Sequence, residues 1–149
     1  MERRFLVLNG PNLNLLGERE PEVYGPVTLE ELEARCVRWG EERGVEVRCA
    51  QSNHEGVLLD RLQEARRDCA GAVVNPGAYT HTSVALHDAI KGTGIALIEL
   101  HISNVHAREP FRHHSCMAAA ARAVMCGFGV MGYGLAIDAV AQWQAQAAA

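Results

Sequence analysis

Lysine, aromatic residues and long apolar runs are scarce in this sequence. Lys91 is the only lysine among 149 residues, so imine chemistry, which needs an amine nucleophile, would depend on that one side chain. Aromatic residues make up 5% of the chain, which leaves few rings to stack against a flavin. No apolar run approaches the roughly 20 residues that span a bilayer. The net charge of −4 argues against a nucleic-acid surface.

The five cysteines are odd in number and contain no CxxC pair. This usage predicts reduced, mainly buried thiols rather than disulfides or metal ligands. The first apolar run begins within about four residues of the start, which leaves no room for a signal peptide, so we expect a cytoplasmic protein. A length of 149 residues predicts one domain, residues 1–149, that buries about 70% of its unfolded surface.

Short apolar runs alternate with helical patterns along the chain. The predicted strands are residues 5–8, 45–49, 71–75, 95–100 and 123–126. The predicted helices are residues 28–43, a second one behind His54, 82–91 and 131–144, followed by a frayed Ala/Gln tail. Thr28 with Glu31, and Ser52 with Glu55, are typical of capping boxes. The second helix is expected to bury Val57, Leu58, Leu59, Leu62 and Ala65.

Five strands alternating with helices predict an α/β fold with a parallel sheet covered on both faces. We expect a flavodoxin-like three-layer sandwich with strand order 2-1-3-4-5. In such sheets ligands bind beyond the carboxyl ends of the strands, at the switch point between strands one and three. Polar residues follow strands one, three and four, whereas the opposite ends carry plain connections such as residues 92–94. This asymmetry predicts a site at one edge of the sheet.

The least ordinary segment is residues 8–25, LNGPNLNLLGEREPEVYG, directly after the first strand. A long loop in this position is usually functional. Its Gly-Pro pair fixes a rigid turn that holds Asn9 and Asn12 at the end of the strand. Gly17 and Gly25 bracket a mobile lid of about residues 17–25. The lid carries Arg19 and Tyr24. A cation close to the phenol, from Arg19 or else from Arg108 or Arg112, would favour its phenolate form, which is a general base. The plain alternative is a surface tyrosine that anchors a loop.

A second candidate pair ends the fourth strand. Glu99 and His101 share a face of that strand, so Glu99 can orient His101 and favour its charged, acidic form. Without further support, a lone histidine at a strand end is more often structural. Asn75 and His81 follow the third strand and belong to the same edge of the sheet.

Two other patterns look functional but fail on context. Residues 127–132 read GFGVMG, a literal GxGxxG after a strand. A dinucleotide site also needs a later strand with an acidic residue, so these glycines more simply predict tight helix–sheet packing. The histidines at 101, 106, 113 and 114 lack the spacing of a metal site, and we predict no metal.

The loop after the first strand resembles the signature of the type II 3-dehydroquinate dehydratases, and the resemblance extends along nearly the whole chain. The matching residues are Asn9, Gly10, Pro11, Asn12, Leu16, Gly17, Arg19, Pro21, Tyr24 and Gly25. The resemblance implies a lyase that removes water from 3-dehydroquinate by anti elimination through an enolate. It also implies a place in aromatic amino acid biosynthesis through the shikimate pathway, or in quinate breakdown.

The resemblance also implies roles for individual residues. Tyr24 would remove the C2 proton with help from Arg19, Asn12 would stabilise the enolate, and His101, oriented by Glu99, would protonate the leaving hydroxyl. Substrate binding would fall to Asn75, Gly77, His81, Asp88, Ile102, Ser103, Arg108 and Arg112. No cofactor is implied. The expected assembly is a homododecamer built from trimers, in which Asp88 reaches a neighbouring subunit's site.

Two rival interpretations remain beside this one. A non-enzymatic flavodoxin-like module would bind a nucleotide or flavin at the same edge, but it would favour a Gly/Ser/Thr-rich loop after the first strand. An inactive paralogue used for assembly is the other, although every matched catalytic position is intact. The sequence departs from the family at Cys116, where an aromatic is usual, and in the small, alanine-rich run of residues 117–121.

Overall fold

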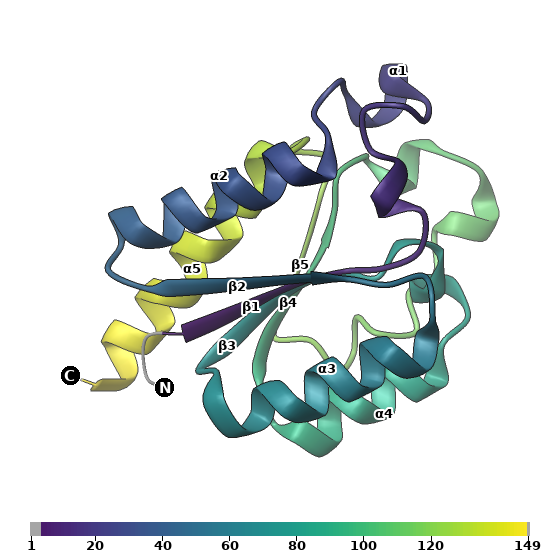
Figure 1. The fold of residues 1–149 in the computed structure, drawn as a ribbon. Coiled ribbons are helices and arrows are strands. Elements are labelled where there is room, and N and C mark those ends of the chain that lie inside the picture. The colour runs from purple at the N-terminus through teal and green to yellow at the C-terminus, as the bar shows by residue number, and fades with distance from the viewer. Residues whose placement is uncertain (1–3, 149) are drawn as a thin grey trace.

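The structure is a computed structural model that describes residues 4–148. Its centre is a parallel sheet of five strands: β1 (Arg4–Asn9), β2 (Glu46–Gln51), β3 (Gly71–Asn75), β4 (Ala96–His101) and β5 (Ala123–Cys126). The helices are α1 (Pro21–Tyr24), α2 (Leu29–Glu42), α3 (Glu55–Asp68), α4 (Val84–Thr93) and α5 (Met131–Ala148). The strand order β2-β1-β3-β4-β5 confirms the predicted three-layer α/β fold (Figure 1).

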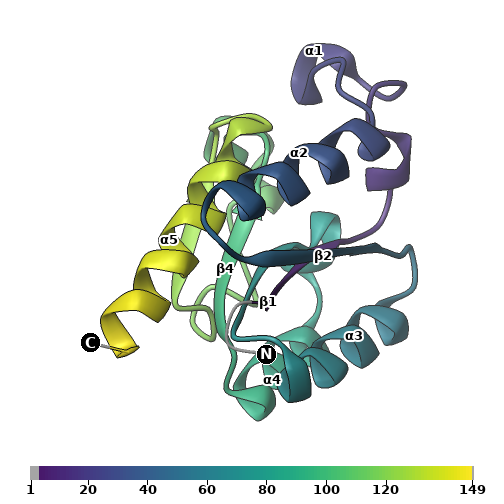
Figure 2. The same ribbon diagram turned by 60° about the vertical axis from the view of Figure 1, so that its left-hand side comes forward.

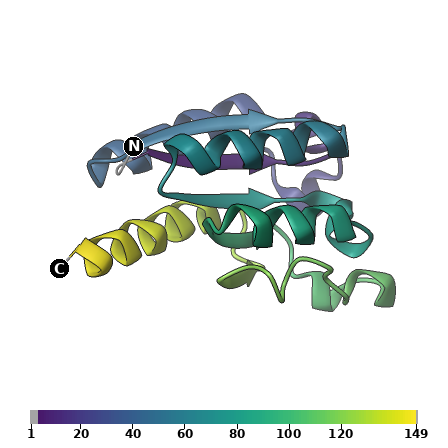
Figure 3. The same ribbon diagram turned by 90° about the horizontal axis from the view of Figure 1, so that it is seen from below.

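Each face of the sheet has its own apolar core. Along β1, Phe5 and Val7 pack on one face, with α2 and α5, whereas Leu6 and Leu8 pack on the other, with α3 and α4. This alternation follows from the period of two in a strand, and a run buried on both sides is the expected result. Figure 2 shows α5 crossing beside α2, and Figure 3 shows α3 and α4 side by side on the opposite face.

The predicted helix ends are right at some positions and wrong at others. The Thr28 hydroxyl accepts a hydrogen bond from the Glu31 amide at 3.2 Å, as a capping residue does. The second capping box is wrong. His54 precedes α3 without a side-chain cap, because the Ser52 hydroxyl instead accepts the His54 amide in a turn before the helix. On α3, Leu58, Leu62 and Ala65 are buried as expected, but Val57 and Leu59 are not.

The carboxyl-terminal helix is longer than predicted. It continues to Ala148, so the expected frayed tail is helical. Two contacts hold this end in place: Gln144 Nε2 donates to the Ala70 carbonyl at 2.9 Å, and the Arg122 guanidinium lies 4.0 Å from the Trp143 ring centre. Within residues 4–148, no helix is both long and apolar enough to cross a membrane.

The glycine-rich run at residues 127–132 turns the chain from β5 into α5. The tight helix–sheet packing predicted for these glycines is wrong at Gly132, and the close contact of this helix is with α2 instead. A side chain at Gly132 would make only ordinary contacts, whereas one at Gly134 would lie 2.8 Å from the Trp39 ring of α2. Gly134 therefore permits the close approach of α5 and α2.

Candidate active site

A cavity opens at the carboxyl ends of β1, β3 and β4, at the switch point that the topology predicts. Its lining contains all but two of the predicted site residues. They are Asn12, Arg19, Tyr24, Asn75, Gly77, His81, His101, Ile102, Ser103, Arg108 and Arg112. The exceptions are Glu99, which lies behind His101, and Asp88, which lies elsewhere.

Tyr24 is the last residue of α1, and its side chain lines the cavity between two arginines. Arg108 Nη1 donates a hydrogen bond to the phenol oxygen at 3.1 Å and another to the Ser103 hydroxyl at 3.0 Å. The Arg19 guanidinium carbon lies over the ring face, 5.0 Å from its centre. The direct donor to the phenol oxygen is therefore Arg108, and Arg19 contributes its charge from above the ring.

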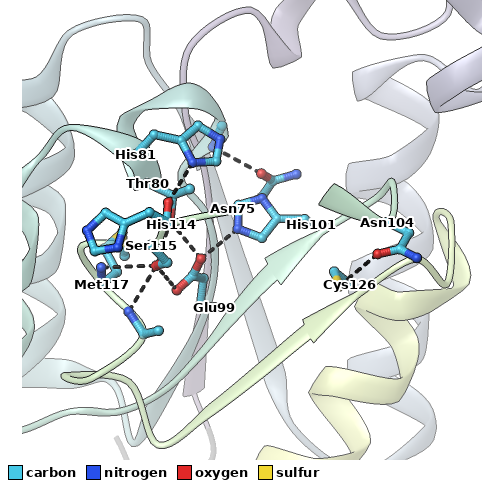
Figure 4. Close-up of polar contacts among 12 residues, drawn as sticks. Asn75, Thr80, His81, Glu99, His101, Asn104, His114, Ser115, Met117 and Cys126 are labelled. Carbon is cyan, nitrogen blue, oxygen red and sulfur yellow. Dashed lines mark hydrogen bonds and ion pairs between the residues drawn. The ribbon is translucent and has the colours of Figure 1, made fainter. Parts of the chain in front are cut away.

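His101 and Glu99 form the predicted pair. His101 Nε2 donates to Glu99 Oε2 at 2.6 Å, and both side chains are buried (Figure 4). The carboxylate accepts two further hydrogen bonds, from the hydroxyls of Thr80 at 2.6 Å and Ser115 at 2.7 Å. Burial raises the pKa of Glu99, but the hydrogen bonds from His101, Thr80 and Ser115 outweigh it and hold that pKa below its ordinary value.

The floor of the cavity is tied to α5 by a buried polar network. Asn9 and Asn75 are register partners at the ends of β1 and β3. The Tyr133 hydroxyl bridges them, since it donates to Asn9 Oδ1 at 2.6 Å and accepts from Asn75 Nδ2 at 2.9 Å. Asn75 Oδ1 in turn accepts the Gly77 amide at 3.1 Å. Burial strongly raises the pKa of Tyr133, so this phenol keeps its proton and remains a donor.

The turn after β1 is tightly constrained. The Gly10 amide donates to the Asn75 carbonyl at 2.7 Å, and a side chain at position 10 would lie 2.5 Å from the Pro76 carbonyl oxygen. Asn12 follows in a left-handed conformation with φ of 70°, and its amide donates to Asn53 Oδ1 at 3.0 Å. Such a backbone is uncommon outside glycine, although asparagine tolerates it better than most residues. The turn therefore holds the Asn12 side chain at the cavity wall.

Two other predicted binding residues are held by neighbours on the loop after β4. His81 Nδ1 donates to the His114 carbonyl at 2.8 Å, which leaves Nε2 for a ligand (Figure 4). Arg112 Nε pairs with Glu109 Oε1 at 3.2 Å. Both side chains therefore present polar groups to the cavity from fixed positions.

Asp88 is not part of the cavity of its own chain. It lines a groove between α3 and α4, together with Arg66 and Arg67. Asp88 therefore lies apart from the other predicted site residues within one chain.

Several residues of this site were not predicted from the sequence. Asn9 was placed at the end of the first strand but was given no role, and Tyr133, Thr80 and Ser115 were not singled out at all. The local sequence around these three hydroxyl-bearing side chains contains no motif that marks them, because their hydrogen-bond partners lie far away in the chain. Tyr133, for instance, is separated from Asn9 by 124 positions.

The five cysteines are free thiols, and only Cys36 and Cys69 are buried, which is fewer than the sequence suggested. Among the described residues, no three metal-binding side chains gather in a way that could hold an ion. The ionisable groups of the cavity are the arginines, the histidines, Tyr24 and the nearby Glu99 carboxylate.

A fold of this class with a basic cavity, a phenol and a histidine–carboxylate pair defines an enzyme site for acid–base chemistry on an anionic substrate. The family model described as dehydroquinase class II matches residues 3–141. The chain is 62% identical over 143 residues to a 3-dehydroquinate dehydratase of Variovorax paradoxus, covering 93% of this chain and 98% of that one. It is 56% identical over 148 residues to a catabolic 3-dehydroquinase of Pyricularia oryzae, covering 97% and 94%.

Solved structures give the same result. The type II dehydroquinase of Propionibacterium acnes superposes with a TM-score of 0.91 at 41% identity, covering 95% of this chain and 98% of that one. The chain belongs to the class II dehydroquinase family. The predicted resemblance and fold are confirmed, and the flavin-binding module is not supported.

Proposed function

We propose a division of labour among the cavity residues for the reaction of this family, the dehydration of 3-dehydroquinate to 3-dehydroshikimate. The chain is a type II 3-dehydroquinate dehydratase, a hydro-lyase. The observation that carries the proposed roles is that a phenol held by arginines and a histidine held by a carboxylate line one cavity. These are a base and an acid in position for elimination.

Tyr24 acts as the base that removes the C2 proton next to the ketone. A free tyrosine phenol has a pKa of about 10, so it needs a stabilising positive charge to lose its proton near neutral pH. The hydrogen bond from Arg108 stabilises negative charge on the phenol oxygen, and Arg19 adds a second positive charge over the ring. The electron pair from the C–H bond then moves to the ketone oxygen and forms an enolate.

Asn12 stabilises that enolate. Its backbone is fixed by the Asn53 contact, so its side chain can donate to the oxygen, directly or through a water, without first being ordered. The electron pair returns to form the C=C bond as the C–O bond to the hydroxyl breaks.

His101 protonates that leaving hydroxyl. Since Nε2 donates to Glu99, Nδ1 is the nitrogen that delivers the proton. Glu99 stabilises the charged imidazolium before the transfer, and the hydroxyl leaves as water.

The remaining cavity residues bind the substrate. The backbone amides of Ile102 and Ser103 receive the carboxylate, while Asn75, His81 and Arg112 bind hydroxyls. Gly77 supports Asn75 through its amide, which donates to the Asn75 side chain.

We expect the lid, residues 17–25, to move when the substrate enters. Arg19 and Tyr24 line the cavity from this segment, so the lid forms part of the cavity wall. Gly17 and Gly25 at the ends of the lid both have positive φ, which suits them to serve as hinges.

The assembly we propose is a homododecamer of trimers, as the family resemblance implies. Its support here is that Asp88 lines an open groove between α3 and α4, away from the cavity of its own chain. Analytical ultracentrifugation tests the assembly, and a monomer at working concentration contradicts it.

The free thiols support a reducing, cytoplasmic location.

The decisive experiment follows the conjugated enone of the product by its ultraviolet absorbance. The wild-type protein should convert 3-dehydroquinate, while folded Tyr24→Phe and His101→Gln variants should lose about 100-fold or more in kcat. If both variants keep near wild-type turnover, the proposed roles of Tyr24 and His101 are wrong.

A further inference from the structure

The Glu99 carboxylate is buried without a permanent cation in contact. Its side chain is 1% exposed, and its three hydrogen-bond partners are His101, Thr80 and Ser115. A carboxylate taken out of water stays ionised only when donors replace the lost hydration. When His101 has given up its proton and is neutral, the two hydroxyls become a major part of that replacement.

The hydroxyl of Ser115 has only one way to direct its proton. Its oxygen accepts the amides of Met117 at 3.1 Å and Ala118 at 3.0 Å, and these occupy both lone pairs of a hydroxyl. The single proton therefore goes to Glu99 Oε1, 2.7 Å away. Ser115 is a donor with a fixed direction.

The same reasoning fixes Thr80. Its oxygen lies 2.6 Å from Glu99 Oε2 and 3.1 Å from the Ser115 oxygen. Since Ser115 has no lone pair left to accept with, the Thr80 proton also goes to Glu99. Each carboxylate oxygen thus accepts a hydrogen bond from one fixed hydroxyl. Oε2 also accepts the hydrogen bond from His101.

Backbone contacts hold the two donors together. Thr80 lies in a 3-10 turn, η2 (Gly77–His81), after β3, whereas Ser115 lies in the loop before β5. The Cys116 amide donates to the Thr80 carbonyl at 2.6 Å, which joins these segments, and the fully buried Met117 anchors the turn behind them. Figure 4 shows the hydroxyls converging on the carboxylate from the side away from His101. The segment of Thr80 also carries His81, which lines the cavity.

We propose that Thr80 and Ser115 are positioning residues that keep the Glu99 carboxylate ionised and aimed at His101, so that the acid keeps its proton until the hydroxyl leaves. The proposal rests on the acid role given to His101. A second hollow behind His101 is lined by Thr80, Glu99 and Ser115. The other titratable or charged groups around the carboxylate line one or both of these spaces: Arg19, Tyr24, His81 and Arg108 in the cavity, His106, His113 and Cys126 in the hollow, and Arg112 in both. None of these donates to Glu99 in the described chain.

The test follows the Glu99 carboxyl directly by carbon-13 NMR of protein labelled at glutamate side chains. The Glu99 signal is assigned by its loss in Glu99→Gln. Thr80→Val removes one donor at nearly constant volume, and Ser115→Ala removes the other. Since a hydrogen bond to a charged group is worth about one to two pH units, Glu99 should titrate at a pH about one unit or more higher in each variant.

Activity should change with the titration. The pH below which kcat falls should move upward in Thr80→Val and Ser115→Ala, and Thr80→Ser, which keeps the donor, should behave as wild type. Thr93→Val is the matched control, because it removes a threonine hydroxyl at the end of α4 that donates to the Ile90 carbonyl and accepts the Ile95 amide, outside the cavity. Amide spectra establish that each variant is folded.

Unchanged titration of Glu99 in folded Thr80→Val and Ser115→Ala overturns the proposal. So does a loss of turnover without any shift in titration, which is the result of a merely structural role. If Ser115→Ala does not fold, the contrast between Thr80→Val and Thr80→Ser decides alone. The acid role is tested separately: near wild-type turnover in His101→Gln removes that role, while the carboxyl titration still reports on the two hydroxyls.

Discussion

The Tyr24 hydroxyl accepts a hydrogen bond of 3.1 Å from Arg108, a residue 84 positions later in the chain. The tyrosine belongs to the lid after β1, and the arginine follows β4. This contact therefore joins the lid to the opposite wall of the cavity. It places the proposed base and its direct stabilising charge on separate segments, so the pair forms only when the lid lies against the site.

The two arginines beside Tyr24 should contribute unequally. Arg108→Met removes a charge-assisted hydrogen bond worth about 1.5–3 kcal/mol, so kcat/KM should fall about 10- to 150-fold. Arg19→Met removes a cation over the ring worth about 0.5–2 kcal/mol, so the loss should be smaller, about 2- to 30-fold. Steady-state assays give both values.

Arg122→Met is the control for these variants. Its guanidinium lies over the Trp143 ring, outside the cavity, so activity should hold. A larger loss in Arg19→Met than in Arg108→Met would contradict the ranking and assign the main electrostatic role to the lid arginine.

Tyr133→Phe should destabilise the fold more than its small chemical change suggests. The variant leaves Asn9 Oδ1 and Asn75 Nδ2 without their partner in a fully buried place. An unsatisfied buried polar group costs about 1–3 kcal/mol, and urea unfolding measures the loss. Because Asn75 is a proposed substrate ligand, KM should also rise.

Tyr79→Phe is matched to this change. It removes a phenol hydroxyl that donates to the Asn53 carbonyl at 2.7 Å near the surface, where water replaces the contact. Its free energy of unfolding should stay within about 0.5 kcal/mol of wild type. Equal losses of unfolding free energy in the two variants would mean that the buried bridge stabilises the fold no more than the surface hydrogen bond does.

The sequence predicted well those features that depend on local pattern. Strand β5 and the pairing of Glu99 with His101 follow from apolar runs and from the two-residue period of a strand, and both are present. The failures are of two kinds. The Ser52 hydroxyl had two possible amide partners nearby, and pattern alone could not choose between a cap and a turn.

The second kind concerns contacts between distant segments. The bridge from Tyr133 to Asn9, and the convergence of Thr80 and Ser115 on Glu99, depend on how α5 and two loops pack after folding. Nothing in the local sequence marks these hydroxyls as different from others. The same holds for the choice of Arg108 over Arg19 as the direct donor to Tyr24.

Acid should reduce the stabilising contribution of Glu99. Its pKa is lowered in the folded protein, so its contribution is complete above the ordinary carboxyl value of about 4.3 and disappears as the pH falls through the lower folded value. The difference in unfolding free energy between wild type and Glu99→Gln should therefore be present at about pH 5 and shrink as the pH falls below about 4.3. Urea unfolding at several pH values measures it. A difference that stays constant down to pH 3 contradicts a lowered pKa.

Gly25→Ala should perturb the lid through the backbone alone. Gly25 has φ of 85° and ψ of 175°, a backbone region essentially limited to glycine, but a side chain there would meet nothing within 4 Å, so the penalty is about 1–3 kcal/mol of backbone strain. The lid relieves that strain by turning away from the cavity, which separates Tyr24 from Arg108 and should lower kcat/KM several-fold. Gly56→Ala is the control, since Gly56 also has open space around it but lies inside α3 with negative φ, where alanine favours the helix. Assays and hydrogen exchange of residues 17–25 compare the two. If Gly25→Ala keeps full activity and an unchanged lid, the glycine is not a hinge.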